Sequence, residues 1–284
     1  MRFPKIAAWA AVVVVLCGSV PAYAELVMGV FPRRPVAVSH KMFSPLAEHL
    51  SQTLGEPVKL VVTKNFKEFW KGVKSKKFDL VHYNQYHYVK SHKELGYNVI
   101  AVNEEFGNKE ISGSLVIRTD SGISSVKDLK GKNIIFGGGK KAMGSYIGPT
   151  AVLKKAGLKP GVDYTEKFAK NPPSSIIATF NHAADAGGAG SVILQIPSIA
   201  KKTDISKLKI LAKSDSYIHL PWAVKSDLPK AKVKKIQSAM VALKDSAEGK
   251  KLLKKAKVTG FHAADDSEFG KVREIVKFSI GESY

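Results

Sequence analysis

The sequence predicts an α/β protein with largely parallel sheets, arranged as two successive units. Segments rich in apolar and β-branched residues alternate with helix-like segments along most of the 284 residues. The same alternation restarts after Asp120, which indicates a second unit with its own sheet. Hydrophobic residues make up 44% of the chain, and this fraction excludes wholesale disorder.

The first unit is expected to contain strands at 26–31, 57–63, 78–83, 98–103 and 113–118. Ser44 and Pro45 are typical of a helix start, because a capping Ser precedes a Pro in the first turn. Asn65 and Glu68 have the spacing of a capping box. They open a second helix, whose apolar face is expected to include Phe66.

The second unit follows the same logic. Its expected elements are a short helix at 125–129, strands at 133–136 and 208–213, helices at 144–156 and 174–180, and a strand or turn of small residues at 185–190. Two amphipathic helices are expected in the last part of the chain. One carries Val233 and Leu243, and the other carries Phe269 and Val276.

Residues 1–24 have the composition of a secretory signal peptide. Arg2 and Lys5 precede an apolar run at 7–17, and Ala22-Tyr23-Ala24 predicts cleavage after Ala24. The apolar run is too short to span a bilayer core of about 30 Å. We therefore expect a soluble periplasmic protein. A lipoprotein signal at Cys17 is disfavoured, because Leu16 stands where such a signal needs a small residue.

The net charge of +21 raises nucleic acid or an anionic membrane as partners. Arginine, however, occurs at only five of the 45 basic positions, and base and phosphate recognition relies on its planar fork. The lysines are interpreted as solvated helix faces, and no nucleic acid is expected. Cys17 is the single cysteine and leaves with the signal, so neither disulfide nor cysteine-bound metal is expected. No cofactor is expected.

The glycine-rich turn at 136–145 is the most informative segment. It follows a strand and opens a helix, so its backbone N–H groups predict an anion site to which Lys140 and Lys141 add positive charge. A dinucleotide pattern, Gly137-x-Gly139-x-x-Ala142, and a purely structural turn remain alternatives. A phosphate-binding P-loop fails, because Ser145-Tyr146 replaces the required Lys and Ser/Thr.

Two further segments follow strands, where open α/β sheets bind ligands. The segment 82–88 offers aromatic faces and neutral donors, although its aromatics could instead pack inward. His82 and His87 lack the spacing of a metal site, so no metal is expected. Arg33 and Arg34 follow the first strand and favour anion contact over a merely solvated loop. No nucleophile–base pair is found, since Ser174-Ser175 lacks the G-x-S-x-G frame, and no enzyme is expected.

An ordered series of short motifs spans nearly the whole chain after residue 24. It includes Gly29-Val30-Phe31-Pro32, Phe43-Ser44-Pro45-Leu46-Ala47, Phe78-Asp79-Leu80-Val81, Asp120-Ser121-Gly122-Ile123, Asp128-Leu129-Lys130-Gly131-Lys132 and Asp185-Ala186-Gly187-Gly188. In this series the chain resembles the periplasmic solute-binding proteins of phosphate/phosphite/phosphonate ABC transporters. The resemblance implies a two-lobed type II periplasmic binding protein fold that closes over a ligand. It implies that 25–118 and 219–284 form lobe one and 119–218 lobe two, with crossings near Arg118 and Ile218.

The resemblance also implies ligand contacts from the turn after Phe31, from Tyr83 and from the helix start after Phe136. Members that bind phosphonate or phosphite usually carry a Ser-Thr-Ser-like run, which falls here on 142–144 and lacks hydroxyls. A His that the family often carries falls at Pro173 or Ser174. The candidate ligand-binding residues are Phe31, Arg33, Tyr83, Gln85, Tyr86, Lys141, Gly144, Ser145, Tyr146 and Ser174.

The expected function is capture of a small, anionic ligand for the permease of an ABC transporter, by a monomeric protein. Delivery of the ligand to a membrane sensor kinase is an alternative within the same architecture. An exported enzyme and a cationic surface-binding protein are alternatives from other classes. The missing hydroxyls leave phosphonate, another oxyanion, an organic acid and a zwitterion open as ligands.

Overall fold

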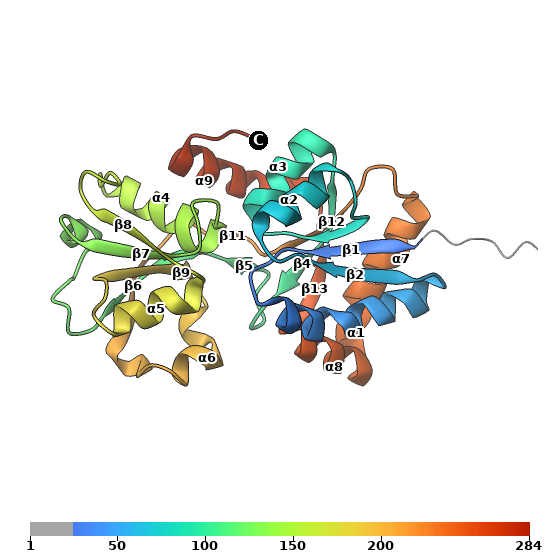
Figure 1. Cartoon of the computed structure of the whole chain (residues 1–284), viewed down its shortest axis with the longest axis horizontal. Coiled ribbons are helices and arrows are strands. Elements are labelled where there is room, and N and C mark those ends of the chain that lie inside the picture. The colour runs from blue at the N-terminus through green and yellow to red at the C-terminus, as the bar shows by residue number, and fades with distance from the viewer. Residues whose placement is uncertain (1–24) are drawn as a thin grey trace, which may run out of the picture.

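A computed structural model describes residues 25–284, so the expected signal peptide and its cleavage site lie outside the described residues. The chain forms two α/β lobes side by side, each built around its own sheet (Figure 1). In the described part of the chain, no helix is both long and apolar enough to cross a membrane.

The first lobe contains a six-stranded sheet in the order β13-β4-β12-β3-β1-β2. Its strands are β1 (Leu26–Val30), β2 (Val58–Val62), β3 (Leu80–His82), β4 (Asn98–Glu104), β12 (Pro221–Val224) and β13 (Gly260–Ala263). β1 pairs in parallel with β2 and β3, whereas β12 and β13 run antiparallel to β4. The parallel pairing brings the carboxyl ends of β1 and β3 to one edge of the sheet, which faces the second lobe (Figure 1).

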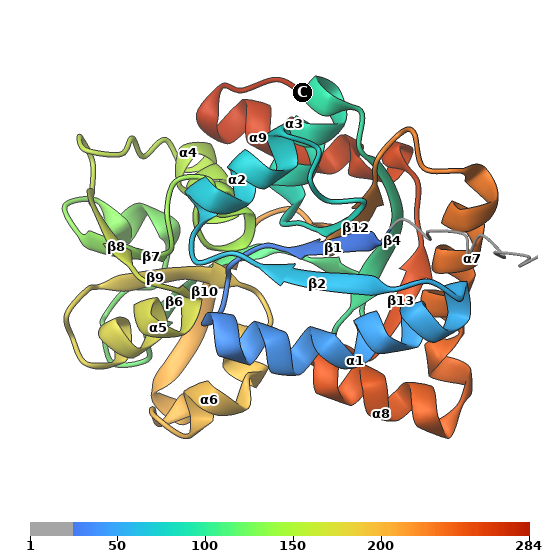
Figure 2. The same cartoon turned by 45° about the vertical axis from the view of Figure 1, so that its right-hand side comes forward.

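Five helices cover this sheet: α1 (Val36–Leu54), α2 (Phe66–Lys74), α3 (Gln85–Leu95), α7 (Lys230–Val241) and α8 (Ala247–Ala256). α1, α7 and α8 lie on one face, and α2 and α3 lie on the other (Figures 1 and 2). The Asn65 side chain accepts the Glu68 N–H at 2.9 Å, which confirms the predicted cap of α2. β12, β13 and the second-lobe strand β8 (Thr165–Ala169) had not been expected from the sequence.

The predicted start of the first helix at Ser44-Pro45 is wrong. α1 begins at Val36, and Pro45 lies inside it. An internal Pro removes a helix hydrogen bond and costs about 3 kcal/mol. Met42, Leu46 and Leu50 form a buried face that continues through Pro45, and burial of this face offsets that cost.

The second lobe contains a five-stranded sheet in the order β10-β6-β9-β7-β8. Its remaining strands are β6 (Gly113–Arg118), β7 (Asn133–Gly137), β9 (Ala186–Gly190) and β10 (Leu208–Lys213), and its helices are α4 (Gly148–Lys155), α5 (Pro172–Phe180) and α6 (Pro197–Ala200). The sequence had placed 113–118 in lobe one. In the structure β6 pairs along its length with β9 and β10, so the chain enters the second sheet before Gly113.

The two lobes are joined by a short antiparallel pair, β5 (Glu110–Ile111) and β11 (Tyr217–Ile218), in which Ile111 faces Tyr217. This pair lies between the lobes in Figure 1. A third connection is α9 (Gly270–Ile280), which packs against α3 of the first lobe and α4 of the second (Figures 1 and 2). One hydrophobic core consequently runs through both lobes by way of Val272 and Val276.

Short helical turns complete the fold, at Val126–Leu129, Met143–Ile147, Ile193–Gln195, Ile205–Lys207, Ala242–Asp245 and Asp266–Phe269. The turn Met143–Ile147 is a π turn that precedes α4, where the sequence predicted one uninterrupted helix. It lies against β9, whose sequence is Ala-Gly-Gly-Ala-Gly. A Cβ on Gly188 would lie 2.4 Å from the Ser145 carbonyl oxygen, so the turn can reach this position only over a strand of small residues.

We predict that Gly188→Ala lowers the free energy of unfolding by about 1–3 kcal/mol, the usual cost of overpacking. The added methyl group would push the backbone of the π turn away from β9. Gly139→Ala is the matched control, because a Cβ there has open space and Gly139 has no positive φ. Chemical denaturation of both variants measures the difference. Equal stabilities would contradict the proposed close approach.

Candidate functional site

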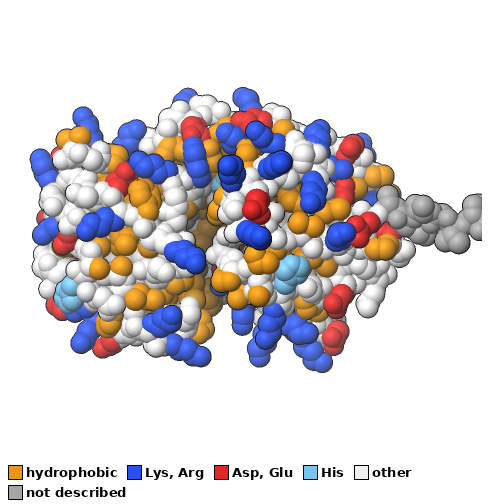
Figure 3. All heavy atoms as spheres, viewed as in Figure 1, with side chains coloured by type: hydrophobic (Ala, Val, Ile, Leu, Met, Phe, Trp, Pro, Cys, Tyr) orange, Lys and Arg blue, Asp and Glu red, His pale blue; other side chains and the backbone are white. Residues whose placement is uncertain are grey.

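A cleft of about 390 Å³ lies between the lobes. Figure 3 shows the hollow, with hydrophobic side chains in its depth and Lys or Arg at its rims. The first lobe contributes Phe31, Pro32, Arg33, Phe66, Asn84, Gln85 and His87. The second lobe contributes 137–145, 170–172 and Gly190, and the segments at the hinge contribute Ile111, Tyr217, His219 and Leu220.

Through residues 137–145, the glycine-rich turn supplies most of the second-lobe residues that line the cleft. Within it Met143, Gly144 and Ser145 line the cleft, and their N–H groups have no acceptor among residues 25–284. They belong to the first turn of a helical segment that continues as α4, where the helix dipole favours an anion. The Tyr146 N–H, which the sequence also suggested for the anion, instead donates to the Ala142 carbonyl oxygen at 2.9 Å.

Three candidate side chains of the second lobe are engaged elsewhere. The Ser145 hydroxyl donates to the Gly137 carbonyl oxygen at 2.5 Å, so its proton is already used. The Tyr146 phenol does not line the cleft and donates to Glu166 at 2.7 Å. Ser174 also lies outside the cleft lining, because its hydroxyl donates to the Oδ1 of Asn171, the N-cap of α5.

The aromatic segment after β3 divides between core and cleft. Tyr83 is fully buried and packs edge-on against Phe69 and Tyr97, so it belongs to the hydrophobic core and not to the cleft wall. Its side chain points away from the cleft because side chains alternate along an extended segment. Gln85 does line the cleft, and its amide nitrogen donates to the Ile218 carbonyl oxygen at 3.1 Å.

Tyr86 lies outside the cleft lining, at a bridge between the lobes. Its hydroxyl donates to Glu282 at 2.6 Å, and Glu282 also forms an ion pair with Lys141 of the second lobe. Burial would raise the pKa of Glu282, but hydrogen bonds from Lys141, Tyr284 and Tyr86 lower it to about 2. The segment after α9 therefore connects a first-lobe aromatic to a cation of the glycine-rich turn.

Four cations line the cleft, and three of them already have a carboxylate partner. Arg33 pairs with Glu105 at 3.1 Å, Lys140 pairs with Glu166 at 3.0 Å, and Lys141 pairs with Glu282. Lys170 forms no ion pair within the part of the chain that the structure describes. Of the residues between 25 and 284 that line the cleft, none is Asp or Glu.

Arg34, the neighbour of Arg33, does not line the cleft. Repulsion by Arg33 and burial lower the pKa of Arg34 to about 10. His82 is also outside the lining, because its ring stacks on Trp222 with centroids 4.3 Å apart. Within residues 25–284 no group of three or more His, Cys, Asp and Glu side chains is arranged to hold a metal ion.

Two polar side chains beside the hinge are buried at the cleft without a partner. These are the Tyr217 hydroxyl and His219 Nε2, which lack a hydrogen-bond partner among the described residues. The nearest carboxylate oxygen to His219 Nε2, Oε2 of Glu105, is 3.8 Å away, beyond hydrogen-bond distance. His219 Nδ1 accepts the Leu220 N–H at 2.8 Å, which assigns the proton of the neutral ring to Nε2. Burial, with a further contribution from Arg33, lowers the pKa of His219 to about 4, although Glu105 opposes the shift.

Sequence reasoning missed Tyr217 and His219, although it expected a lobe crossing near Ile218, between them. It also missed the cleft positions of Phe66 and Asn171, whereas Asn84 lies in the segment 82–88 that it had proposed for ligand binding. Asn171 is the N-cap of α5, so the capping pattern at this helix start was the available signal.

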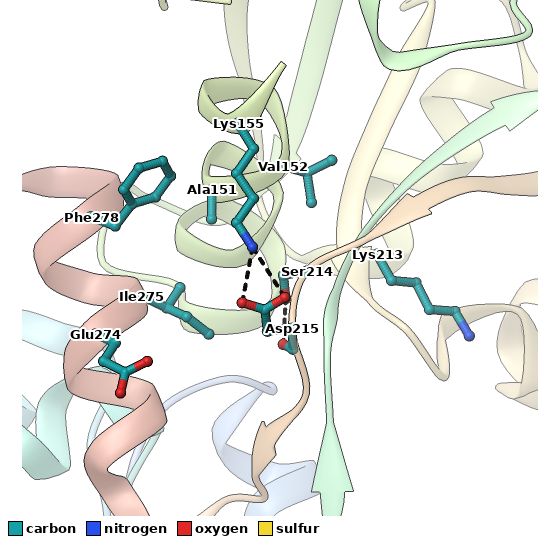
Figure 4. A pocket seen from close by; sticks show the side chains of 9 residues that line it. All are labelled: Ala151, Val152, Lys155, Lys213, Ser214, Asp215, Glu274, Ile275 and Phe278. Carbon is teal, nitrogen blue, oxygen red and sulfur yellow. Dashed lines mark hydrogen bonds and ion pairs between the residues drawn. The ribbon is translucent and has the colours of Figure 1, made fainter. Parts of the chain in front are cut away.

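A smaller hollow of about 260 Å³ lies between α4, the end of β10 and α9 (Figure 4). Lys155 and Asp215 face each other there at 2.9 Å and satisfy one another. No residue that lines this hollow between 25 and 284 has a buried polar side-chain atom without a partner. The interlobe cleft is therefore the candidate site.

Two α/β lobes, a paired hinge and a cleft between strand ends define a two-lobed type II periplasmic binding protein, which confirms the predicted fold. Residues 28–269 match the family model of the phosphonate ABC transporter periplasmic substrate-binding protein. The chain belongs to this family, whose members are periplasmic substrate-binding components of a transporter, not enzymes.

Solved structures share the fold at low sequence identity. A binding protein component of an ABC phosphonate transporter from Pseudomonas aeruginosa is 18% identical, with a TM-score of 0.76 over 89% of this chain and 86% of that one. A protein from Prochlorococcus marinus in complex with methylphosphonate is 19% identical, with a TM-score of 0.78 over 90% and 98%. A protein from Xanthomonas citri bound to ATP is 14% identical, with a TM-score of 0.73 over 90% and 96%.

We predict that His219 makes stability fall between pH 6.5 and pH 4. Since its pKa is about 4 in the folded protein and 6.5 in the unfolded chain, the unfolded chain binds a proton in this window that the folded protein does not. Wild type should lose about 2–3 kcal/mol more than His219→Asn, whose amide oxygen can accept the Leu220 N–H. Denaturant titrations at pH 7 and 4.5 measure this. Equal losses would contradict the burial of a neutral His219.

Proposed function

We propose that this protein captures a small phosphonate-like anion in the interlobe cleft and delivers it to the permease of an ABC transporter. The observation that carries the proposal is a set of hydrogen-bond donors on cleft-lining residues that have no acceptor among residues 25–284. These donors are the Tyr217 hydroxyl, His219 Nε2 and the N–H groups of Met143, Gly144 and Ser145. An oxyanion supplies the several acceptor lone pairs that such a set requires.

The position of Tyr217 offers a physical account of the missing hydroxyl run at 142–144. A Cβ placed on Gly144 would lie 3.6 Å from the Tyr217 hydroxyl, so this hydroxyl occupies space beside the glycine. We propose that the Tyr217 hydroxyl, a donor from the hinge, takes the role of the missing hydroxyls of the turn. The headgroup would be held by neutral donors, with Arg33 and Lys141 as nearby countercharges.

The same arrangement supports closure of the lobes over the ligand. Donors from the second-lobe turn and from the hinge could hold one ligand together with first-lobe residues such as Arg33 and Gln85. We propose that the lobes move about the β5–β11 pair, with lobe one before Gly113 and after Ile218. The paired crossings at this hinge fit a rotation that leaves both sheets intact.

We predict that Tyr217→Phe weakens the binding of methylphosphonate by about tenfold, the value of one hydrogen bond to a charged group. The variant should be at least as stable as wild type, because it removes a buried hydroxyl that has no partner. Isothermal titration calorimetry measures the affinity, and thermal unfolding measures the stability.

Tyr164→Phe is the matched control for this test. The Tyr164 hydroxyl is also buried without a partner, but Tyr164 does not line the cleft. Its loss should leave the affinity unchanged. If wild type binds neither methylphosphonate nor phosphate, phosphite or sulfate, the proposed function is wrong. If both variants lose affinity equally, the assignment of Tyr217 to the headgroup is wrong.

A further inference from the structure

All the charged side chains that line the cleft between residues 25 and 284 are positive. Arg33, Lys140, Lys141 and Lys170 line it, and no Asp or Glu does so among residues 25–284. The carboxylates of Glu105, Glu166 and Glu282 pair with three of these cations but are absent from the cleft lining. The charged groups that a ligand in the cleft can contact directly are therefore cations.

We propose that the cleft selects phosphonates whose substituent is uncharged and apolar, and that it discriminates against substituents that carry an ammonium group. This inference rests on the proposed function, since it concerns the part of the ligand beyond the anionic headgroup. Two independent properties of the lining support it, namely its acceptors and its apolar surface.

Two amide oxygens of the cleft are already occupied, whereas Gln85 Oε1 and His87 Nε2 accept no hydrogen bond among residues 25–284. Asn84 Oδ1 accepts from the N–H and from Nδ1 of His87, both at 2.8 Å. Asn171 Oδ1 accepts from the N–H and the hydroxyl of Ser174, at 3.0 and 2.9 Å. An ammonium group entering the cleft would lose its hydration among cations and N–H donors and would gain no carboxylate in return.

The remaining surface of the cleft is apolar. Its apolar lining residues include Phe31, Phe66, Ile111, Met143, Pro172 and Leu220. Phe31 and Phe66 contact each other with ring centroids 6.2 Å apart. A cleft of about 390 Å³ is in the size range of sites for organic ligands and exceeds the needs of a headgroup alone. Each methylene group buried there should raise the affinity by about fourfold.

The decisive comparison is between propylphosphonate and 2-aminoethylphosphonate, which have nearly the same shape because a methyl group replaces an ammonium group. Calorimetry on the wild-type protein should show that propylphosphonate binds more tightly than methylphosphonate. It should also show that 2-aminoethylphosphonate binds at least tenfold more weakly than propylphosphonate. Equal or tighter binding of 2-aminoethylphosphonate would overturn this inference and leave the proposed function intact, provided that methylphosphonate binds. Failure of all three to bind would reject this inference, and it would reject the proposed function as well if phosphate, phosphite and sulfate also failed to bind.

A variant that adds a carboxylate to the cleft tests whether charge causes the preference for propylphosphonate. Phe66 lines the cleft, is 39% exposed and begins α2, where a helix N-terminus tolerates a negative charge. Phe66→Gln removes the same ring without adding charge, so the loss of apolar surface is common to both variants. Phe66→Glu should reduce the preference for propylphosphonate over 2-aminoethylphosphonate about tenfold more than Phe66→Gln does. If the two variants change the preference equally, charge in the cleft is not the determinant and the inference is wrong.

Discussion

The close approach of the π turn to β9 is the constraint on which the site depends. Because a Cβ on Gly188 would lie 2.4 Å from the Ser145 carbonyl oxygen, the turn can rest on the sheet only where side chains are missing. This contact holds Met143, Gly144 and Ser145, whose N–H groups have no acceptor among residues 25–284, at the cleft. The Ser145 hydroxyl contributes to the same arrangement, since it ties the turn to the Gly137 carbonyl oxygen at the end of β7. The small residues of β9 thus allow the turn to reach the cleft, although Gly190 is the one β9 residue that lines it within the described part of the chain.

The β5–β11 pair joins the lobes, and residues 217–219 carry two polar side-chain groups that lack hydrogen-bond partners among residues 25–284. Tyr217 faces Ile111 across the β5–β11 pair, and His219 follows directly. Burial of two polar groups without partners costs free energy in the unliganded protein, and a ligand that satisfies them recovers this cost. Under the proposed function, the residues that join the lobes would also recognise the ligand, so that binding and closure would be coupled through one short segment.

The sequence predicted the lobed fold well because the ordered motifs and the alternation of strands and helices extend over nearly the whole chain. The errors have physical causes. Pro45 was misread as a helix start because the burial of the α1 face, a tertiary effect, outweighs a local preference. For the site, position after a strand was a good guide to Arg33 and Gln85 but not to Tyr83, because an extended segment sends alternate side chains to opposite faces. The donors at the hinge were missed because their value depends on a lack of partners, which only three-dimensional contacts reveal.

The positive charges at the cleft are largely compensated by carboxylates, whereas the charge of the whole chain is not. The net charge of +21 comes largely from lysines, many of them exposed on helices such as α7 and α8. At the cleft, Arg33, Lys140 and Lys141 each have a carboxylate partner, so much of their charge is compensated before a ligand arrives. In the proposed complex an anion is held chiefly by directed donors, whereas an ammonium substituent would find no carboxylate among the residues between 25 and 284 that line the cleft. On this proposal, binding of the headgroup depends on unpaired hydrogen-bond donors, and rejection of an ammonium substituent depends on the position of the carboxylates outside the lining.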